Sequence, residues 1–259
     1  MSFVPLSDVS HSDLLKNIRL IATDMDGTLT QKGKFTPQFI QALEDLDRVN
    51  IKVLIVTGRS AGWVSGLATY LPIVGAIAEN GGLFYLSGND APITLTDISN
   101  FDIHRQQLAE VFRKLQIQFP QLQETSDNRF RMTDWTFDVR GLSVEQLQHL
   151  SQKCYALGWG FTYSNVQCHI KPLNQDKAIG LLQVLREYFP QSNLEQVMTV
   201  GDSPNDESLF DINKFPLSVG VNNVLHYAEQ MNHRPAYITT ASEGEGFCEL
   251  AKEILSSIS

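Results

Sequence analysis

The chain has 259 residues, of which 42% are apolar and 19% charged, so it is long enough for a sizeable core and a second, smaller unit. A formal net charge of −9 argues against a broad nucleic-acid surface, because such surfaces need clustered Lys and Arg. No run approaches about 18 apolar residues and residues 1–17 lack a signal-peptide pattern, so we expect no membrane partner and a cytoplasmic protein with a short N-terminal extension.

Short runs rich in Ile and Val predict buried parallel strands at 18–23, 51–56 and 196–200. Between the first two, Thr36 is a typical N-cap and Pro37 suits the first position of a helix. This order predicts a βαβ unit. The three cysteines lack metal-ligand spacing, and we expect no disulfide among them.

The alternation continues with a strand at 74–78, helices near 176–189 and 204–210, a strand near 216–219 and a closing helix after Gly246. The predicted class is therefore α/β, with a doubly wound, Rossmann-like parallel sheet as the core. We assign residues 18–82 and 172–259 to this core.

Residues 83–171 have a different pattern and predict an inserted α+β cap domain. A helix is expected near 103–119, two strands within 121–140, a helix at 143–157 and a hairpin within 161–171. The order is αββαββ. Because the insert leaves and re-enters beside the same sheet edge, we expect it to form a lid over that edge.

Acidic side chains come directly after the predicted strands. Asp24 and Asp26 lie after the first strand, and residues two apart in an extended segment project to the same side. Two carboxylates in one small volume favour a cation, and hard oxygen ligands suit Mg²⁺. The strand ending at 200 leads to Asp202 and Asp206, where helix capping would explain one acidic residue but not both.

A second set of residues suits an anion. Thr57 and Gly58 come after the second strand, and a hydroxyl next to free amides is a reasonable phosphate cradle. Lys177 opens a predicted helix, where its charge opposes the helix dipole unless an anionic partner is present. Taken singly each motif is common; together, at three separate strand ends, they predict one phosphate and metal site.

The segments 24–28, Thr57, Lys177 and 201–206 resemble the four motifs of the haloacid dehalogenase superfamily. The insert resembles the type IIB cap of Cof-like sugar phosphatases, sucrose-phosphatase and mannosyl-3-phosphoglycerate phosphatase, and residues 79–82 resemble the Asn-Gly turn before that cap.

The resemblance implies a Mg²⁺-dependent phosphomonoester hydrolase. Asp24 would be the nucleophile that forms an aspartyl-phosphate, and Asp26 the general acid and base. Mg²⁺ would be held by Asp24, the Asp26 carbonyl and Asp202. The transferring oxygens would be held by Thr57, Gly58, Lys177 and Asn205, with Asp206 orienting Lys177 or metal-bound water.

Two alternatives stay open. A phosphomutase shares this cap type and the wording of residues 26–30, but no segment like Asn-Val-Ser-Pro-Ile-Gly-Arg is found in the cap. A non-catalytic module that binds a phosphorylated metabolite is the other, although all the acidic and cationic positions are present.

The partner is expected to be a small phosphorylated metabolite, with a sugar phosphate favoured. Period two on the cap strands places Asp138 and Arg140, and on the neighbouring strand Gln167, His169 and Lys171, on a polar face. We expect Asp138, Arg140, His169 and Lys171 to contact the substrate there. The sequence gives no indication of oligomeric state.

Overall fold

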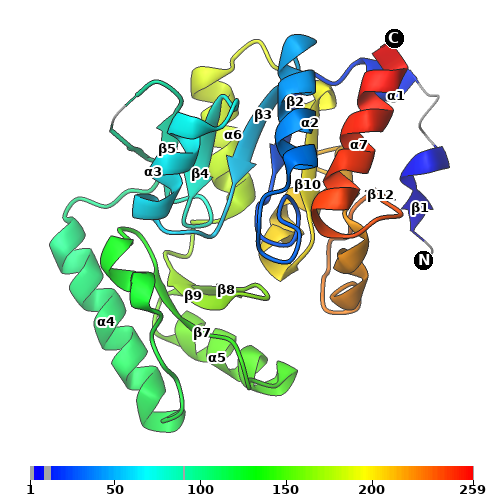
Figure 1. Ribbon diagram of the computed structural model, residues 1–259. Coiled ribbons are helices and arrows are strands. Elements are labelled where there is room, and N and C mark those ends of the chain that lie inside the picture. Colours follow the sequence, from blue (N-terminus) through cyan, green and yellow to red (C-terminus); the bar gives the residue numbers. More distant parts are fainter. Residues whose placement is uncertain (1–2, 9–12, 90, 259) are drawn as a thin grey trace.

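The structure, a computed structural model, describes residues 3–8, 13–89 and 91–258 (Figure 1). These residues form a nine-stranded sheet and a separate three-stranded antiparallel sheet. The predicted fold class, a mostly parallel α/β core with an inserted α+β cap, is confirmed. None of the described helices is both long and apolar enough to cross a membrane.

The large sheet is parallel along most of its width. From β1 at one edge as far as β4, each strand pairs parallel with its neighbour. At the other edge, β5 pairs antiparallel with β4, and β6 antiparallel with β5. In spatial order the strands are β1 (Val4–Pro5), β12 (Tyr237–Ile238), β11 (Leu217–Gly220), β10 (Val197–Gly201), β2 (Leu20–Thr23), β3 (Lys52–Val56), β4 (Gly75–Ala78), β5 (Leu83–Leu86) and β6 (Ile93–Thr94).

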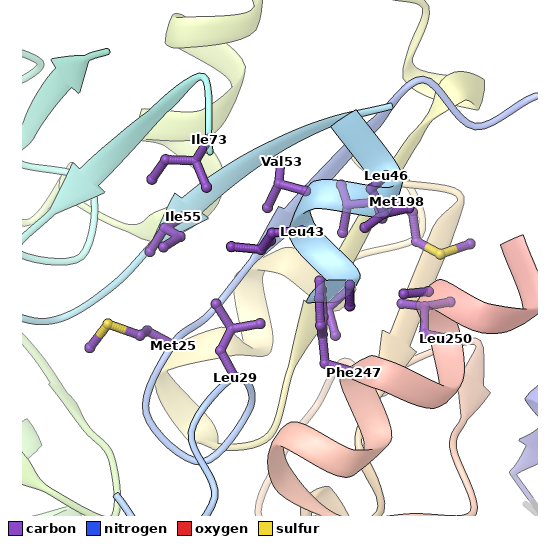
Figure 2. Close-up of a cluster of buried hydrophobic side chains, with 14 of the residues drawn as sticks. Met25, Leu29, Leu43, Leu46, Val53, Ile55, Ile73, Met198, Phe247 and Leu250 are labelled. Carbon is purple, nitrogen blue, oxygen red and sulfur yellow. The ribbon is translucent and has the colours of Figure 1, made fainter. Parts of the chain in front are cut away.

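Helices cover both faces of this sheet. Alternation along β3 sends Ile55 to one apolar cluster and Val56 to the other. The first cluster lies under α2 (Pro37–Arg48), α3 (Ala61–Tyr70) and α7 (Glu243–Ile258), and the second under α6 (Lys177–Tyr188). Figure 2 shows Leu43 of α2 and Phe247 of α7 within the first cluster. Since both faces are covered, the central strands are mostly apolar, as the sequence predicted, with buried hydroxyl residues such as Thr23 and Thr199 among them.

Local signals set several helix ends. Thr36 caps α2 by accepting a hydrogen bond from the Phe39 amide at 3.2 Å. The helix expected near 204–210 is a 3-10 helix, η4 (Pro204–Phe210), and the closing helix begins at Glu243, before Gly246. The other short elements are η1 (Leu6–Asp8), α1 (Asp13–Lys16), η2 (Ser126–Phe130), η3 (Leu194–Gln196) and η5 (Asn222–His226).

The cap consists of α4 (Phe101–Gln118), β7 (Trp135–Asp138), α5 (Val144–Ala156), β8 (Gly160–Tyr163) and β9 (Gln167–Lys171). Its sheet order is β7-β9-β8, and the hairpin β8–β9 lies on the side of the core (Figure 1). One expected strand is wrong: between 121 and 134 the backbone forms η2, so only an isolated bridge from Glu124 to Phe137 is left of it. The cap helices pack on the apolar side of the sheet, at Phe137, Cys168 and Ile170, as predicted.

Two expected boundaries need correction. Residues 83–94, assigned to the cap, form β5 and β6 of the core sheet, because the chain turns back at 79–82 and pairs antiparallel with β4. The expected N-terminal extension is in part core: β1 pairs with β12, and Leu6 and Leu15 are buried. Residues 1–2 and 9–12 of that segment lie outside the described residues.

Candidate active site

The functional side chains gather where β10, β2 and β3 end side by side. The carboxyl ends of parallel strands share one edge of the sheet, so the loops after these strands meet there. The cap hairpin covers this edge and leaves a narrow cavity beside Asp24. The lining residues are Asp24, Asp26, Thr57, Gly58, Arg59, Ser203 and Asn205 from the core, and Ser164, Val166, Gln167 and His169 from the cap.

Three buried carboxylates form the floor. One oxygen each of Asp24, Asp202 and Asp206 lies within 4.8 Å of the others. Lys177, fully buried, donates to Asp24 Oδ1 and to Asp206 Oδ1, the latter at 2.7 Å. The second oxygen of Asp24 has no hydrogen-bond partner among the described residues.

The cluster carries more negative charge than its lysine offsets. Burial raises the pKa of Asp24 to about 7, even though the charge of Lys177 opposes this. Burial, together with the charge of Asp24, raises the pKa of Asp202 well above its usual range. Burial alone would lower the pKa of Lys177, but Asp206 and Asp24 outweigh it and raise that pKa. A cluster of hard oxygen donors with unbalanced charge fits a divalent cation such as Mg²⁺.

The turn after β2 is built around Asp202. Gly27 has φ 83°, and a Cβ there would come within 2.6 Å of Asp202 Oδ2, so only glycine fits. Thr28 donates to Asp202 Oδ1 at 3.1 Å. Asn223, which the sequence did not point out, donates to Asp202 Oδ2 at 2.8 Å and to the Gly27 carbonyl at 3.0 Å. Within the described part of the chain, the side chains that donate to Asp202 are thus both neutral.

Asp206 holds the neighbouring turn. Its Oδ2 accepts from the backbone amides of Asp202 at 2.9 Å and Ser203 at 3.0 Å, while its Oδ1 accepts from Lys177. One carboxylate therefore fixes both the loop after β10 and the lysine.

Asp26 forms an ion pair that the sequence did not predict. Its side chain lines the same cavity as that of Asp24. Arg59 holds it through two hydrogen bonds, Nε to Asp26 Oδ2 at 2.7 Å and Nη2 to Asp26 Oδ1 at 2.6 Å. The carboxylate cluster therefore contains Asp206 and not the Asp26 side chain. Since the guanidinium occupies both oxygens of Asp26, Arg59 has to move before either oxygen can contact a substrate.

Polar groups surround the space beside Asp24. Asn205 donates to Asn80 Oδ1 at 3.1 Å, and the Asn80 amide nitrogen has no partner among the described residues. Thr57 Oγ1 accepts from the Arg59 amide at 3.2 Å, which leaves its hydroxyl hydrogen for a ligand. Thr57, Gly58 and Asn205 thus line one wall of the cavity.

Of the four cap residues expected to contact the substrate, one lies at the cavity and three lie elsewhere. His169 lines the cavity. Asp138 and Arg140 pair with each other on the surface, Arg140 NH2 lying 2.5 Å from Asp138 Oδ2, because the β7 strand ends there and its side chains reach solvent. Lys171 is buried and donates to the carbonyl of Gln175, away from the cavity.

The cap is clamped to the core by Glu79, which the sequence did not identify as functional. Its carboxylate accepts from the amides of Ala61 at 2.9 Å, Met132 at 3.1 Å and Thr133 at 2.6 Å. Gly81, two residues on, has φ 97°, and a Cβ there would lie 2.1 Å from the Asp176 carbonyl. The turn at 79–82 resembled that of the family, but its role as a clamp depends on partners about 50 residues away.

Comparison with known proteins agrees with this geometry. A family model described as haloacid dehalogenase-like hydrolase matches residues 21–129 and 124–246. The phosphoglycolate phosphatase of Methanothermobacter thermautotrophicus is 26% identical over 241 residues, 92% of this chain and 99% of that protein. The phosphoglycolate phosphatase of Thermoplasma volcanium is 28% identical over 200 residues, 76% of this chain and 83% of that protein.

Solved structures share the fold. The sucrose-phosphatase of Synechocystis, in complex with sucrose and phosphate, superposes with a TM-score of 0.66 at 18% identity, over 92% of this chain and 98% of that one. The C-terminal domain of trehalose-6-phosphate phosphatase from C. albicans gives a TM-score of 0.72 at 12% identity, over 100% of both chains.

The chain belongs to the haloacid dehalogenase-like hydrolases. Within that family it is a phosphatase with a type IIB cap, so the resemblance seen in the sequence is confirmed.

Proposed function

We propose that the protein hydrolyses a small phosphomonoester in two steps, with Mg²⁺ as cofactor and an aspartyl-phosphate on Asp24 as intermediate. The observation that carries this proposal is the position of Asp24: it lies in the buried carboxylate cluster, beside Lys177, and on the wall of a cavity lined with polar groups.

In the first step the free oxygen of Asp24 attacks phosphorus, and the bond between phosphorus and the alcohol oxygen breaks. Lys177 holds Asp24 Oδ1, so the carboxylate keeps one orientation during attack. Thr57, Gly58 and Asn205 line the cavity and Lys177 contacts Asp24, so we expect Thr57, the Gly58 amide, Lys177 and Asn205 to donate to the phosphoryl oxygens, where negative charge is concentrated.

Asp26 serves as acid and then as base. It gives a proton to the departing alkoxide, and in the second step takes one from the water that attacks the aspartyl-phosphate, which restores Asp24 and releases phosphate. Since Arg59 occupies both oxygens of Asp26, we expect the phosphoryl group to draw Arg59 away when the substrate binds.

Asp24, Asp202 and the main-chain carbonyl of Asp26 would hold the metal, and Asp206 would orient Lys177 beside it. When bound, Mg²⁺ supplies positive charge that offsets the repulsion between the Asp24 carboxylate and the phosphoryl oxygens. The unbalanced carboxylate cluster supports this assignment.

The cavity supports a small leaving group. The enclosed space beside Asp24 is little more than that of one water molecule, so the cap has to open for a substrate, and a short leaving group needs the least opening. Phosphoglycolate, which the relatives' names point to, and short sugar or polyol phosphates have leaving groups of this kind.

The test is release of inorganic phosphate from a panel at saturating Mg²⁺: p-nitrophenyl phosphate, phosphoglycolate, glycerol phosphate, glucose 6-phosphate and sucrose 6-phosphate. We expect the short substrates to have the highest kcat/KM. Absence of turnover on every member would favour a non-catalytic binding module, and transfer of phosphate to a second sugar position would favour a mutase.

A further inference from the structure

Two largely buried side chains of the cap, Gln167 and His169, present polar atoms to the catalytic cavity. Gln167 is 5% exposed and His169 1% exposed, and both line the cavity. They are two residues apart on β9 and therefore share one face of the cap sheet. Among the described residues, His169 forms a hydrogen bond through Nδ1, and neither its Nε2 nor the Gln167 amide has a hydrogen-bond partner. Since both side chains line the cavity, these polar atoms face its open space, where a ligand can bond with them.

The ring of His169 is fixed from behind. Its Nδ1 lies 2.7 Å from Asp134 Oδ2, and Asp134 is fully buried. Arg131 contacts both oxygens of Asp134, at 2.9 and 3.0 Å, and also donates to the Gly58 carbonyl at 3.0 Å. A Cβ on Gly58 would lie 3.2 Å from His169 Cε1, so the ring stands directly against the phosphate cradle.

These contacts determine which nitrogen carries the proton. Burial alone would raise the pKa of Asp134, but the charge of Arg131 and the hydrogen bond with His169 lower it to about 2. An ionised carboxylate only accepts, so His169 Nδ1 must donate. Burial lowers the pKa of His169, although Asp134 opposes this. The ring is therefore neutral, with a bare Nε2 that accepts.

We propose that Gln167 and His169 form a subsite for a hydroxyl group on the leaving group, and that Asp134 is the positioning residue that keeps His169 Nε2 an acceptor. The inference rests on the proposed phosphatase function and narrows its substrate to hydroxylated alkyl phosphates. The Gln167 amide offers both a donor and an acceptor, so a second hydroxyl can be held beside the first.

A carboxylate is poorly served at this position. It would face the lone pair of His169 Nε2, which repels an anion, whereas a hydroxyl group can donate to that nitrogen. The protein therefore differs in preferred substrate from the phosphoglycolate phosphatases that it resembles.

The experiment compares glycerol 1-phosphate with propyl phosphate, which have the same carbon chain with and without hydroxyl groups. In His169→Asn, the amide overlaps the position of Nδ1 and leaves the cavity side without a polar atom. In His169→Gln, the amide reaches the position of Nε2. We expect His169→Asn to lower the ratio of kcat/KM for the two substrates by about 10-fold or more, and His169→Gln to restore part of it. His149→Asn, on the exposed side of α5, is the matched control and should leave the ratio unchanged.

Asp134→Asn adds a readout besides activity. An amide donating to Nδ1 moves the ring proton to Nε2, which nitrogen NMR of His169 detects, and kcat/KM should then shift from glycerol 1-phosphate toward phosphoglycolate. Equal losses on both substrates in His169→Asn, or a wild-type preference for phosphoglycolate, would overturn the hydroxyl subsite. Absence of turnover on all three substrates by the wild-type protein would instead contradict the proposed phosphatase function.

Discussion

Replacing the nucleophile tests chemistry and electrostatics together. Asp24→Asn keeps the size of the side chain and an oxygen for Lys177, but an amide does not attack phosphorus as a carboxylate does. We expect phosphate release to fall by at least about 100-fold, which corresponds to about 2.7 kcal/mol in the activation free energy.

The same change should stabilise the metal-free protein. Burial raises the pKa of Asp24 from 3.8 to about 7, so the folded state holds the protonated form more tightly than the unfolded state does. The resulting stabilisation is complete below about pH 3.8 and is lost as pH rises through about 7. A rise of about three pKa units means that ionised Asp24 lowers the free energy of unfolding at about pH 8 by at most about 4 kcal/mol.

Asparagine removes that cost but also weakens the contact with Lys177. We therefore expect a net gain of about 1 to 2 kcal/mol, or roughly 2 to 8 °C in Tm, at about pH 8 in EDTA. Thermal unfolding followed by circular dichroism measures the gain, and the difference should shrink toward about pH 4.5. Saturating Mg²⁺ should raise the Tm of the wild-type protein more than that of the variant.

Two results would refute this expectation. Residual activity above about one hundredth of wild type would remove Asp24 from the role of nucleophile. A Tm for the variant at or below that of wild type, at about pH 8 without metal, would mean that the cluster does not carry unbalanced charge.

The other predictions concern the metal, the acid and the cap surface. EDTA should abolish activity, and Mg²⁺ should restore it better than Ca²⁺, whose looser coordination misplaces the attacking oxygen; full activity in chelator would contradict a metal site. Asp26→Ala should lose more kcat/KM on alkyl phosphates than on p-nitrophenyl phosphate, because nitrophenolate leaves without a proton, and equal losses would exclude Asp26 as the acid. Asp138→Ala and Arg140→Ala should change kcat/KM on any substrate by less than about twofold, since these side chains pair on the surface, and a tenfold loss would place that ion pair at the site.

Much of the core and its chemistry can be predicted from local sequence. The apolar runs at 18–23 and 51–56, separated by a capped helix, predict parallel strands, and the loops after parallel strands all lie at one edge of the sheet. The sequence therefore predicts that Asp24, Thr57 and Asp202 lie close together. It adds Lys177 to this group because a lysine at the start of a helix is stabilised by a nearby anion.

Tertiary contacts decided which partner each side chain takes. Asp26 pairs with Arg59, and Asp206 completes the cluster, because these choices depend on how two loops fold over each other. The residues after 82 join the core sheet because of a turn clamped by the distant backbone of 132–133.

The cap shows the same limit most clearly. Because side chains alternate between the two faces of a strand, the sequence predicted that Asp138 and His169 lie on the polar face of the cap sheet. The alternation of side chains along β7 and β9 agrees with both assignments. Of these two, His169 alone reaches the cavity, because it lies on the central strand β9, whereas Asp138 ends the edge strand β7 and pairs with Arg140 on the surface. The pleat is a local property of the backbone, whereas the position of the cap over the core arises from contacts between residues far apart in the chain, among them Arg131 with Gly58.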